Sequence, residues 1–336
     1  MARRVVLHVG SMKSGTSYLQ GLMMSNRDLL AERGLRLPGR VWRDQVSGVA
    51  EVLGRTRVAH APEDGAWRRL VDELADWSGV GLISMEFLGP VGVKKVERVV
   101  SSFPEGSVEV VVTARDLNRQ IPAMWQEALK NGRSFTFDEY VEFVRVHDGP
   151  GNSFWREQTV AAMCRRWSEV VGRDRVTLVT VPRPGAATDE LWRRFSDAIG
   201  IDGSGVAQPP SANESLGAAS LEVLRRLNAL VDDLEFPAYA PVVKHKLAKK
   251  VLAARRSVEQ PVGFEVPDWL PALSERMVGR LSDLGVRVVG DLDDLTPVAV
   301  PGVRPGEVPG EERLDAAVAG LEGLVRALVR RTADDG

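Results

Sequence analysis

The stretch "HVGSMKSGTSYLQ", His8 to Gln20, places a cation and several hydroxyls inside a loop bounded by glycines. Gly10 and Gly15 have the five-residue spacing of a phosphate-binding loop, and Lys13 lies between them. An apolar run precedes the loop and a helix-like apolar period follows it. At such a strand-to-helix turn the backbone N–H groups and the helix dipole favour a bound anion. These residues therefore predict a site for a phosphate-like group.

The position of the lysine narrows the class of reaction that the loop could support. The common nucleotide loop, G-x-x-x-x-G-K-[ST], carries its lysine after the second glycine. Here Thr16 stands at that position, and the lysine, Lys13, precedes the glycine. Lys13 would therefore contact a bound nucleotide from a different position than the lysine of the common loop does. Ser14, Thr16 and Ser17 add hydroxyl donors where the helix starts.

The residues "KSGTSYLQ", Lys13 to Gln20, resemble the 5′-phosphosulfate loop of sulfotransferases that use 3′-phosphoadenosine 5′-phosphosulfate (PAPS). The resemblance implies that Lys13, Ser14, Gly15, Thr16 and Ser17 bind the donor and that Lys13 stabilises the leaving phosphate. A sulfuryl group carries less charge than a phosphoryl group, so one lysine and a ring of amides can replace a metal clamp. We therefore expect PAPS as donor and no metal.

A PAPS enzyme must also bind the 3′-phosphate, and the resemblance implies an arginine at the end of a later strand. "VEVVVTAR" ends in Arg115, whose planar guanidinium suits a phosphate. Pairing of Arg115 with Asp116 is the alternative. Where the family often has a serine, this chain has Ala123, so Arg119 or Asn118 would supply the second contact.

Transfer to a hydroxyl requires a general base. The resemblance implies a histidine or a glutamate at the end of the strand between the two phosphate sites, and "GLISMEFLG" delivers Glu86 there. A carboxylate in an apolar run is out of place unless it faces a cleft, although a capping or salt-bridged glutamate is the alternative. His60 is the reserve base. His8 lies in the first strand, where a hydrogen-bonded core histidine is expected.

The acceptor is predicted only as a class, a hydroxyl of a small molecule or a saccharide. Trp125 and Gln126 follow the strand of the 3′-phosphate site, so they either line the acceptor pocket or belong to a helical core. "WREQ", residues 155–158, is a further candidate for the edge of the cleft.

Near-continuous apolar runs alternate with helical periods in the first half of the chain, which indicates a parallel sheet covered on both faces. The predicted strands are 3–10, 80–88, 107–115, 175–182 and 286–290. Helices are expected over 16–34 and 154–171, among others. The resemblance, which extends over about 1–297, implies a P-loop NTPase-like α/β sulfotransferase fold with a helical second half.

The domain boundaries follow from composition. Residues 1–297 are expected to form the sulfotransferase domain, with a sheet core over about 1–182 and a helical acceptor or cap region over about 183–297. Residues 298–310 are rich in Pro, Gly and Val and predict a linker. The amphipathic C-terminal helix in 311–336 would cap the domain or pair with another subunit, giving a possible homodimer.

Composition excludes several other classes. Hydrophobic content of 44%, charged content of 27% and a net charge of −2 are those of an ordinary soluble protein, with no field drawing it to nucleic acid or membrane. No run approaches the roughly 18 apolar residues of a membrane helix. A single cysteine, Cys164, excludes an intrachain disulfide framework and fits a reducing cytoplasm.

Two other functions are compatible with a nucleotide loop. A P-loop kinase would use ATP and magnesium, with Asp116 imitating the metal carboxylate, but Lys13 is misplaced for that chemistry. A non-catalytic nucleotide-binding protein is favoured by Ala123, while Glu86 speaks against it.

Overall fold

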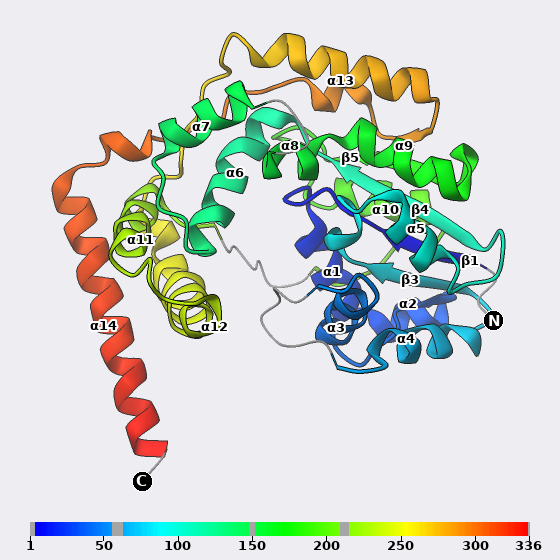
Figure 1. The fold of residues 1–336 in the computed structure, drawn as a ribbon, viewed down its shortest axis with the longest axis horizontal. Coiled ribbons are helices and arrows are strands. Elements are labelled where there is room, and N and C mark those ends of the chain that lie inside the picture. The colour runs from blue at the N-terminus through cyan, green and yellow to red at the C-terminus, as the bar shows by residue number, and fades with distance from the viewer. Residues whose placement is uncertain (1–3, 56–62, 148–151, 209–214, 335–336) are drawn as a thin grey trace. The chain divides into compact units, whose positions relative to one another are not determined.

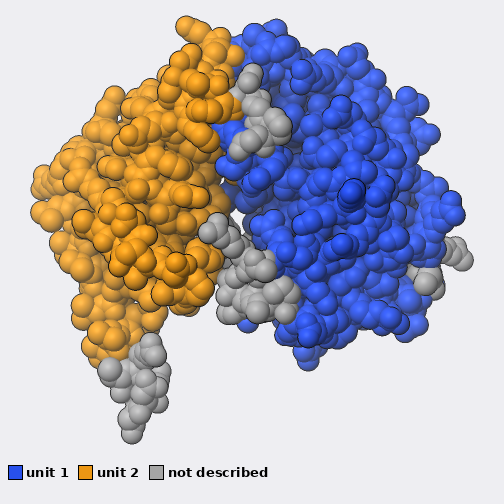
Figure 2. Space-filling model, in the orientation of Figure 1, with its two compact units in different colours: residues 1–117, 149–211, 270–296 blue, residues 118–148, 212–269, 297–336 orange. Residues whose placement is uncertain are grey.

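The computed structural model describes residues 4–55, 63–147, 152–208 and 215–334. The chain forms two compact units, coloured separately in Figure 2. Unit 1 consists of residues 1–117, 149–211 and 270–296, and unit 2 of residues 118–148, 212–269 and 297–336. The chain therefore passes between the units several times.

Unit 1 is built on a six-stranded sheet in which all neighbouring strands are parallel (Figure 1). The strands are β1 (Arg4–His8), β2 (Leu35–Arg36), β3 (Val80–Ser84), β4 (Val108–Ala114), β5 (Val176–Thr180) and β6 (Arg287–Val289). Their order across the sheet is β2-β3-β1-β4-β5-β6. The predicted α/β class with a central parallel sheet is confirmed. Strand β2 was not predicted, because two residues are too few to show a period.

Strand β1 lies between β3 and β4. The chain leaves β1 toward one side of the sheet, forms β2 and β3, and then crosses to the other side to form β4. In open α/β sheets, ligands bind at the carboxyl ends of strands where the strand order reverses in this way. The segments that follow β1, β3 and β4 meet at that edge.

Helices cover both faces of the sheet (Figure 1). On one face Val6 and Val111 belong to a buried cluster with residues of α1 and α10. Alternation along the strands turns their neighbours to the other face, where α9 contacts β4 and β5 and packs on α5. The helices of unit 1 are α1 (Thr16–Ser25), α2 (Arg27–Glu32), α3 (Trp42–Val52), α4 (Ala66–Ala75), α5 (Val93–Val100), α8 (Ser153–Gln158), α9 (Val160–Val171), α10 (Glu190–Ile199) and α13 (Leu270–Leu284).

Two helices predicted as continuous are each broken once. The helix expected over 16–34 stops at Ser25 and restarts at Arg27, with Asn26 between the two parts. The amide of Asn26 donates to the carbonyl of Leu22, a local bond that competes with helix propagation. The helix expected over 154–171 breaks at Thr159 into α8 and α9.

Unit 2 is mainly helical. Its elements are α6 (Leu117–Lys130, of which Leu117 belongs to unit 1), α7 (Phe137–Val146), α11 (Ala218–Leu230), α12 (Phe236–Tyr239), a π-helical segment η3 (Ala240–Val251), the 3₁₀ segments η4 (Leu252–Val258) and η6 (Pro305–Glu307), and α14 (Gly310–Asp334). Among the described residues no helix is long and apolar enough to cross a membrane.

The division of the chain differs from the sequence-based expectation. The segment 298–310, predicted as a linker, packs in unit 2, where Phe264 and Val300 exchange two backbone hydrogen bonds and Gly263 donates to Val303. Proline and glycine there shape a turn that is held by backbone bonds. The helical part expected over 183–297 is also divided, because residues 270–296 return to unit 1 and add α13 and β6.

Candidate active site at the carboxyl ends of three strands

The loop after β1 has the backbone of an anion site. Gly10, Lys13 and Gly15 all have positive φ, at 97°, 61° and 82°. A residue with a side chain seldom adopts this conformation, and where one does the position is often functional. Gly15 is the N-cap of α1, and no side chain caps that helix start. The N–H groups of the first turn of α1 therefore point toward a place where an anion can lie.

Both glycines of the loop also permit close packing. A Cβ on Gly10 would lie 3.1 Å from Cβ of Glu86, and a Cβ on Gly15 would overlap Cδ2 of Leu191. The loop is thus pressed against the segment after β3 on one side and against α10 on the other. This packing supports the conformation of the loop.

The substitution Gly15→Ala is expected to lower the free energy of unfolding by about 1–3 kcal/mol, because the added methyl group meets Leu191 and the φ of 82° strains any L-residue. Gly21→Ala in α1 is a matched control, since nothing lies within 4 Å of its Cβ position. That variant should gain roughly 0.5–1 kcal/mol. Urea denaturation of both variants checks the pair, and equal stabilities would contradict the packing described.

A buried polar network lies beneath the loop. His8 Nδ1 is 2.8 Å from Ser84 Oγ, and His8 Nε2 is 3.1 Å from Thr113 Oγ1. Thr113 Oγ1 is in turn 2.6 Å from Ser14 Oγ, which donates to the Ser11 carbonyl at 2.5 Å. The network ties β3, β1 and β4 to the loop, and it places the Ser14 hydroxyl in a structural role.

Complete burial lowers the pKa of His8 to about 3. The imidazole is therefore neutral at pH 7, and it is enclosed by its two hydroxyl partners and the edge-on ring of Phe195. The expected core histidine is confirmed. His8 is therefore a structural residue of the sheet core.

The buried His8 predicts a loss of stability in weak acid. An unfolded histidine has a pKa near 6.5, so the unfolded chain binds the additional proton between about pH 6.5 and pH 3, and stability falls as the pH falls through that range. Lowering the pH from 7.5 to 5.5 should cost about 1.4 kcal/mol through this residue. Urea unfolding at both pH values, compared between His8→Gln and the exposed-site control His147→Gln, measures the difference. An equal pH dependence in His8→Gln and the wild type would contradict it.

Glu86 lies beside the loop, but it is not part of the strand in which the sequence predicted it. Strand β3 ends at Ser84 rather than continuing to residue 88, because its partner β1 ends at His8 and the last bond runs from Met85 N to His8 O at 2.9 Å. Glu86 then opens a 3₁₀ turn, Glu86–Leu88. Its half-buried carboxylate accepts a hydrogen bond from Gln20 Nε2 of α1 at 3.3 Å.

Positive charge lies close to Glu86. The guanidinium of Arg55 stacks on the ring of Phe87 at 4.2 Å from the ring centroid. Burial lowers the pKa of Arg55, while the carboxylates of Glu157 and Glu86 act in the opposite direction. The side of the site next to Glu86 is therefore built from charged and aromatic groups together.

Arg115 follows β4 directly and reaches the loop, where its Nη1 donates to the carbonyl of Lys13 at 3.5 Å. The loop itself is bonded to β4, since Ser11 N donates to Thr113 O and Thr113 N to Gly10 O, each at 2.6 Å. These bonds bring together Lys13 and Arg115, which are far apart in the sequence.

The two residues predicted as possible second donors of the 3′-phosphate site are Asn118 and Arg119. The Asn118 amide already donates to two carbonyls of unit 2, Phe264 O at 3.1 Å and Val298 O at 2.9 Å. Both of its N–H donors are therefore used, which removes Asn118 from the two alternatives. Arg119 follows in α6 and is 8% exposed. Arg119 belongs to unit 2, whereas Arg115 belongs to unit 1.

Of the three residues suggested for the acceptor, Trp125 and Gln126 belong to unit 2. Trp125 is fully buried in unit 2, where its indole donates to Phe135 O and its ring meets Phe137 edge to face. Of the two possibilities left by the sequence, the structure has the helical core. Gln126 accepts a hydrogen bond from Leu216 N within the same unit. His60 lies outside the described residues.

Two glutamines complete the surroundings of the loop. Gln20 bonds Ser84 as well as Glu86, with Nε2 3.2 Å from Ser84 O and 3.1 Å from Ser84 Oγ. Gln158 donates from α8 to Met12 O at 3.2 Å, so one residue of the segment 155–158 contacts the loop. Gln20 was not predicted as a site residue, although the sequence places its polar side chain one turn into the helix that follows the loop.

Comparisons with known proteins give one match. No family model matches the chain, and no curated protein matches it. A crystal structure of a sulfotransferase from Alicyclobacillus acidocaldarius is similar at 18% sequence identity and a TM-score of 0.43, over 69% of this chain and 97% of that chain. Within the described residues, no group of three or more His, Cys, Asp or Glu side chains could hold a metal ion.

Proposed function

We propose that the chain is a sulfotransferase that moves a sulfuryl group from PAPS to a hydroxyl. The observation that carries the proposal is the meeting of three groups at the ends of adjacent strands. Lys13 follows β1 in the loop that leads to the uncapped start of α1. Glu86 follows β3 and packs against Gly10. Arg115 follows β4 and donates to Lys13 O. A phosphate loop, a carboxylate and an arginine in this arrangement suit a charged donor and a hydroxyl acceptor.

The residues present fit both charged ends of PAPS. The 5′-phosphosulfate would lie at the uncapped start of α1, with the N–H groups of the first turn and the hydroxyls of Thr16 and Ser17 as donors. The 3′-phosphate would be bound by Arg115, which follows β4. Bound there, PAPS supplies an activated sulfuryl group. We propose that no metal takes part.

The side chains would divide the chemistry between them. Glu86 would accept the proton of the acceptor hydroxyl as the new sulfur–oxygen bond forms. Lys13 would hold the negative charge that remains on the phosphate oxygen when the old sulfur–oxygen bond breaks. Gln20 would orient the Glu86 carboxylate through the hydrogen bond at 3.3 Å. The acceptor is proposed as a small molecule or a saccharide.

The proposal is tested by titrating the purified chain calorimetrically with 3′,5′-ADP, the desulfated donor, without magnesium. We expect binding, and we expect Arg115→Ala to weaken it about 10- to 100-fold, because a charged hydrogen bond contributes roughly 1.5–3 kcal/mol. Arg173→Ala, at an exposed position of unit 1, is the control and should leave the affinity unchanged.

Each alternative function predicts a different result in the binding titration or in a turnover assay. Binding of ATP with magnesium, without binding of 3′,5′-ADP, would indicate a P-loop kinase and overturn the proposal. Binding of 3′,5′-ADP without donor turnover, over a broad set of phenolic, alcoholic and saccharide acceptors, would favour a non-catalytic nucleotide-binding protein.

A further inference from the structure

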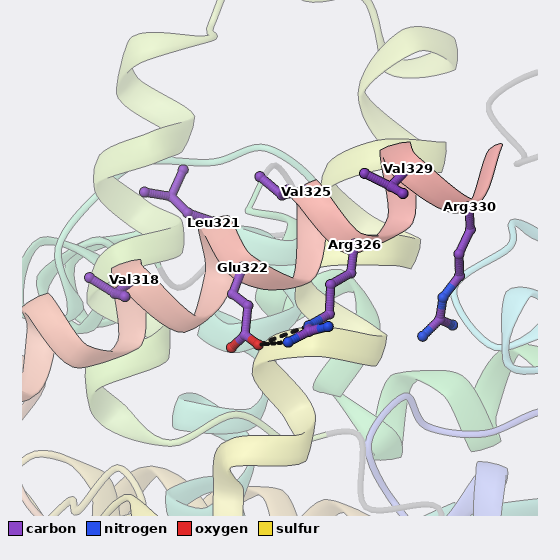
Figure 3. A pocket seen from close by; sticks show the side chains of 7 residues that line it. All are labelled: Val318, Leu321, Glu322, Val325, Arg326, Val329 and Arg330. Carbon is purple, nitrogen blue, oxygen red and sulfur yellow. Dashed lines mark hydrogen bonds and ion pairs between the residues drawn. The ribbon is translucent and has the colours of Figure 1, made fainter. Parts of the chain in front are cut away.

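The last helix of unit 2 carries an apolar face that is exposed to solvent. We call this face the α14 stripe and define it as Leu314, Val318, Leu321, Val325 and Leu328. Each of these side chains is between 56% and 64% exposed. Val329 adjoins the stripe, and Figure 3 shows Val318, Leu321, Val325 and Val329 following one another along the helix.

The stripe is not the face by which α14 packs in its own unit. Small residues let that face approach closely. Ala316 is fully buried, a Cβ on Gly320 would lie 3.2 Å from Cδ1 of Leu247, and a Cβ on Gly323 would overlap Val251. The helix therefore lies close against η3 through alanine and glycine. The side chains of the stripe lie outside this contact.

The spacing of the stripe identifies the kind of contact. Successive members are four, three, four and three residues apart, from Leu314 to Leu328. This is the heptad spacing by which one helix packs along another, and it extends over about 21 Å at 1.5 Å per residue. An isolated exposed apolar residue needs no explanation, but a contiguous row of this length indicates an interaction surface. The spacing points to a helix as the partner.

The charges beside the stripe identify the partner helix. The first turns of α14 are acidic on balance, with Glu311, Glu312 and Asp315 around Arg313, and the later turns are basic, with Arg326 and Arg330. A second copy of α14 laid antiparallel brings the acidic turns of each helix opposite the basic turns of the other. A parallel copy would bring like charges together.

The charges in the middle of α14 are already paired within the helix. Glu322 and Arg326 form an ion pair within α14 at 2.8 Å, drawn as dashed lines in Figure 3. The charge pattern of α14 is thus complementary to itself about its centre, as a twofold interface requires. We propose that two copies of this chain associate through antiparallel pairing of their α14 stripes.

The mass of the chain in solution tests the association. Sedimentation equilibrium should give twice the 36.7 kDa of the single chain, and Leu321→Asp should return it to the single mass. Leu230→Asp is the matched control, because Leu230 is also exposed, at 80%, but lies in α11 outside the stripe. A wild-type monomer at about 100 µM would overturn the proposal, as would a dimer that Leu321→Asp leaves intact.

The direction of pairing is tested by crosslinking. Burial raises the pKa of the native thiol, Cys164, to about 12, so introduced cysteines react selectively. Mixing a Leu314→Cys chain with a Leu328→Cys chain and adding a short bismaleimide should crosslink the two different chains. Crosslinks within each variant alone, 314 to 314 or 328 to 328, would indicate parallel helices and overturn the proposal.

Discussion

Replacing Lys13 with alanine is expected to reduce the release of 3′,5′-ADP from PAPS about 10²- to 10³-fold. The physical reason is the charge that grows on the leaving phosphate oxygen, since removal of one preorganised donor to such an oxygen costs roughly 2.7–4 kcal/mol. Lys13 sits in the loop at φ 61°, in the strand-to-helix turn that would hold the sulfuryl end of the donor. The reaction with an acceptor found by screening, followed at saturating donor, gives the measurement.

Two variants separate charge from structure. Lys13→Arg keeps the charge and should recover part of the rate, while Lys94→Ala removes an exposed lysine of α5 and should leave the rate unchanged. Folding is monitored by the melting temperature of each variant. A Lys13→Ala enzyme that turns over at the wild-type rate would exclude Lys13 from the chemistry.

Glu86→Gln is expected to reduce turnover about 10²- to 10⁴-fold while the dissociation constant for 3′,5′-ADP stays the same. Glutamine has nearly the shape of glutamate but takes up no proton. Its side chain can still accept the bond from Gln20, which keeps the packing against Gly10 intact. Turnover is measured with the screened acceptor, and affinity is measured separately by calorimetry.

The control for this substitution is Glu97→Gln, which removes an exposed carboxylate of the same unit. It should change neither quantity. A Glu86→Gln variant with normal turnover would remove Glu86 as the base. A variant with equally weakened nucleotide binding would instead show that its carboxylate supports the loop.

The sequence was informative where a pattern depends on neighbours in the chain. A strand, a glycine-bounded loop and a helix were readable around Lys13, because periods of two and of about three and a half residues leave visible marks. Arg115 was assigned to the end of β4 for the same reason. The structure adds the bonds between Ser11, Gly10 and Thr113 that place these two segments together.

Features that depend on distant partners were not readable. The end of β3 at Ser84 is decided by the length of β1, and the order of 298–310 is decided by backbone groups near Phe264. Whether Trp125 faces a pocket or a core depends equally on Phe135 and Phe137, which come later in the chain. In each case a residue well away in sequence determines the outcome.

The central place of β1 has a consequence for how the protein is made. Of the strands, β1 leaves the ribosome first, yet both of its partners, β3 and β4, come later, the second ending at Ala114. At a synthesis rate of about 5–20 residues per second, the apolar segment of β1 waits roughly 5–20 s before it can be paired on both edges. During that interval its unpaired backbone is open to other nascent chains. A holding chaperone that binds near Val5 should therefore raise the yield of folded protein.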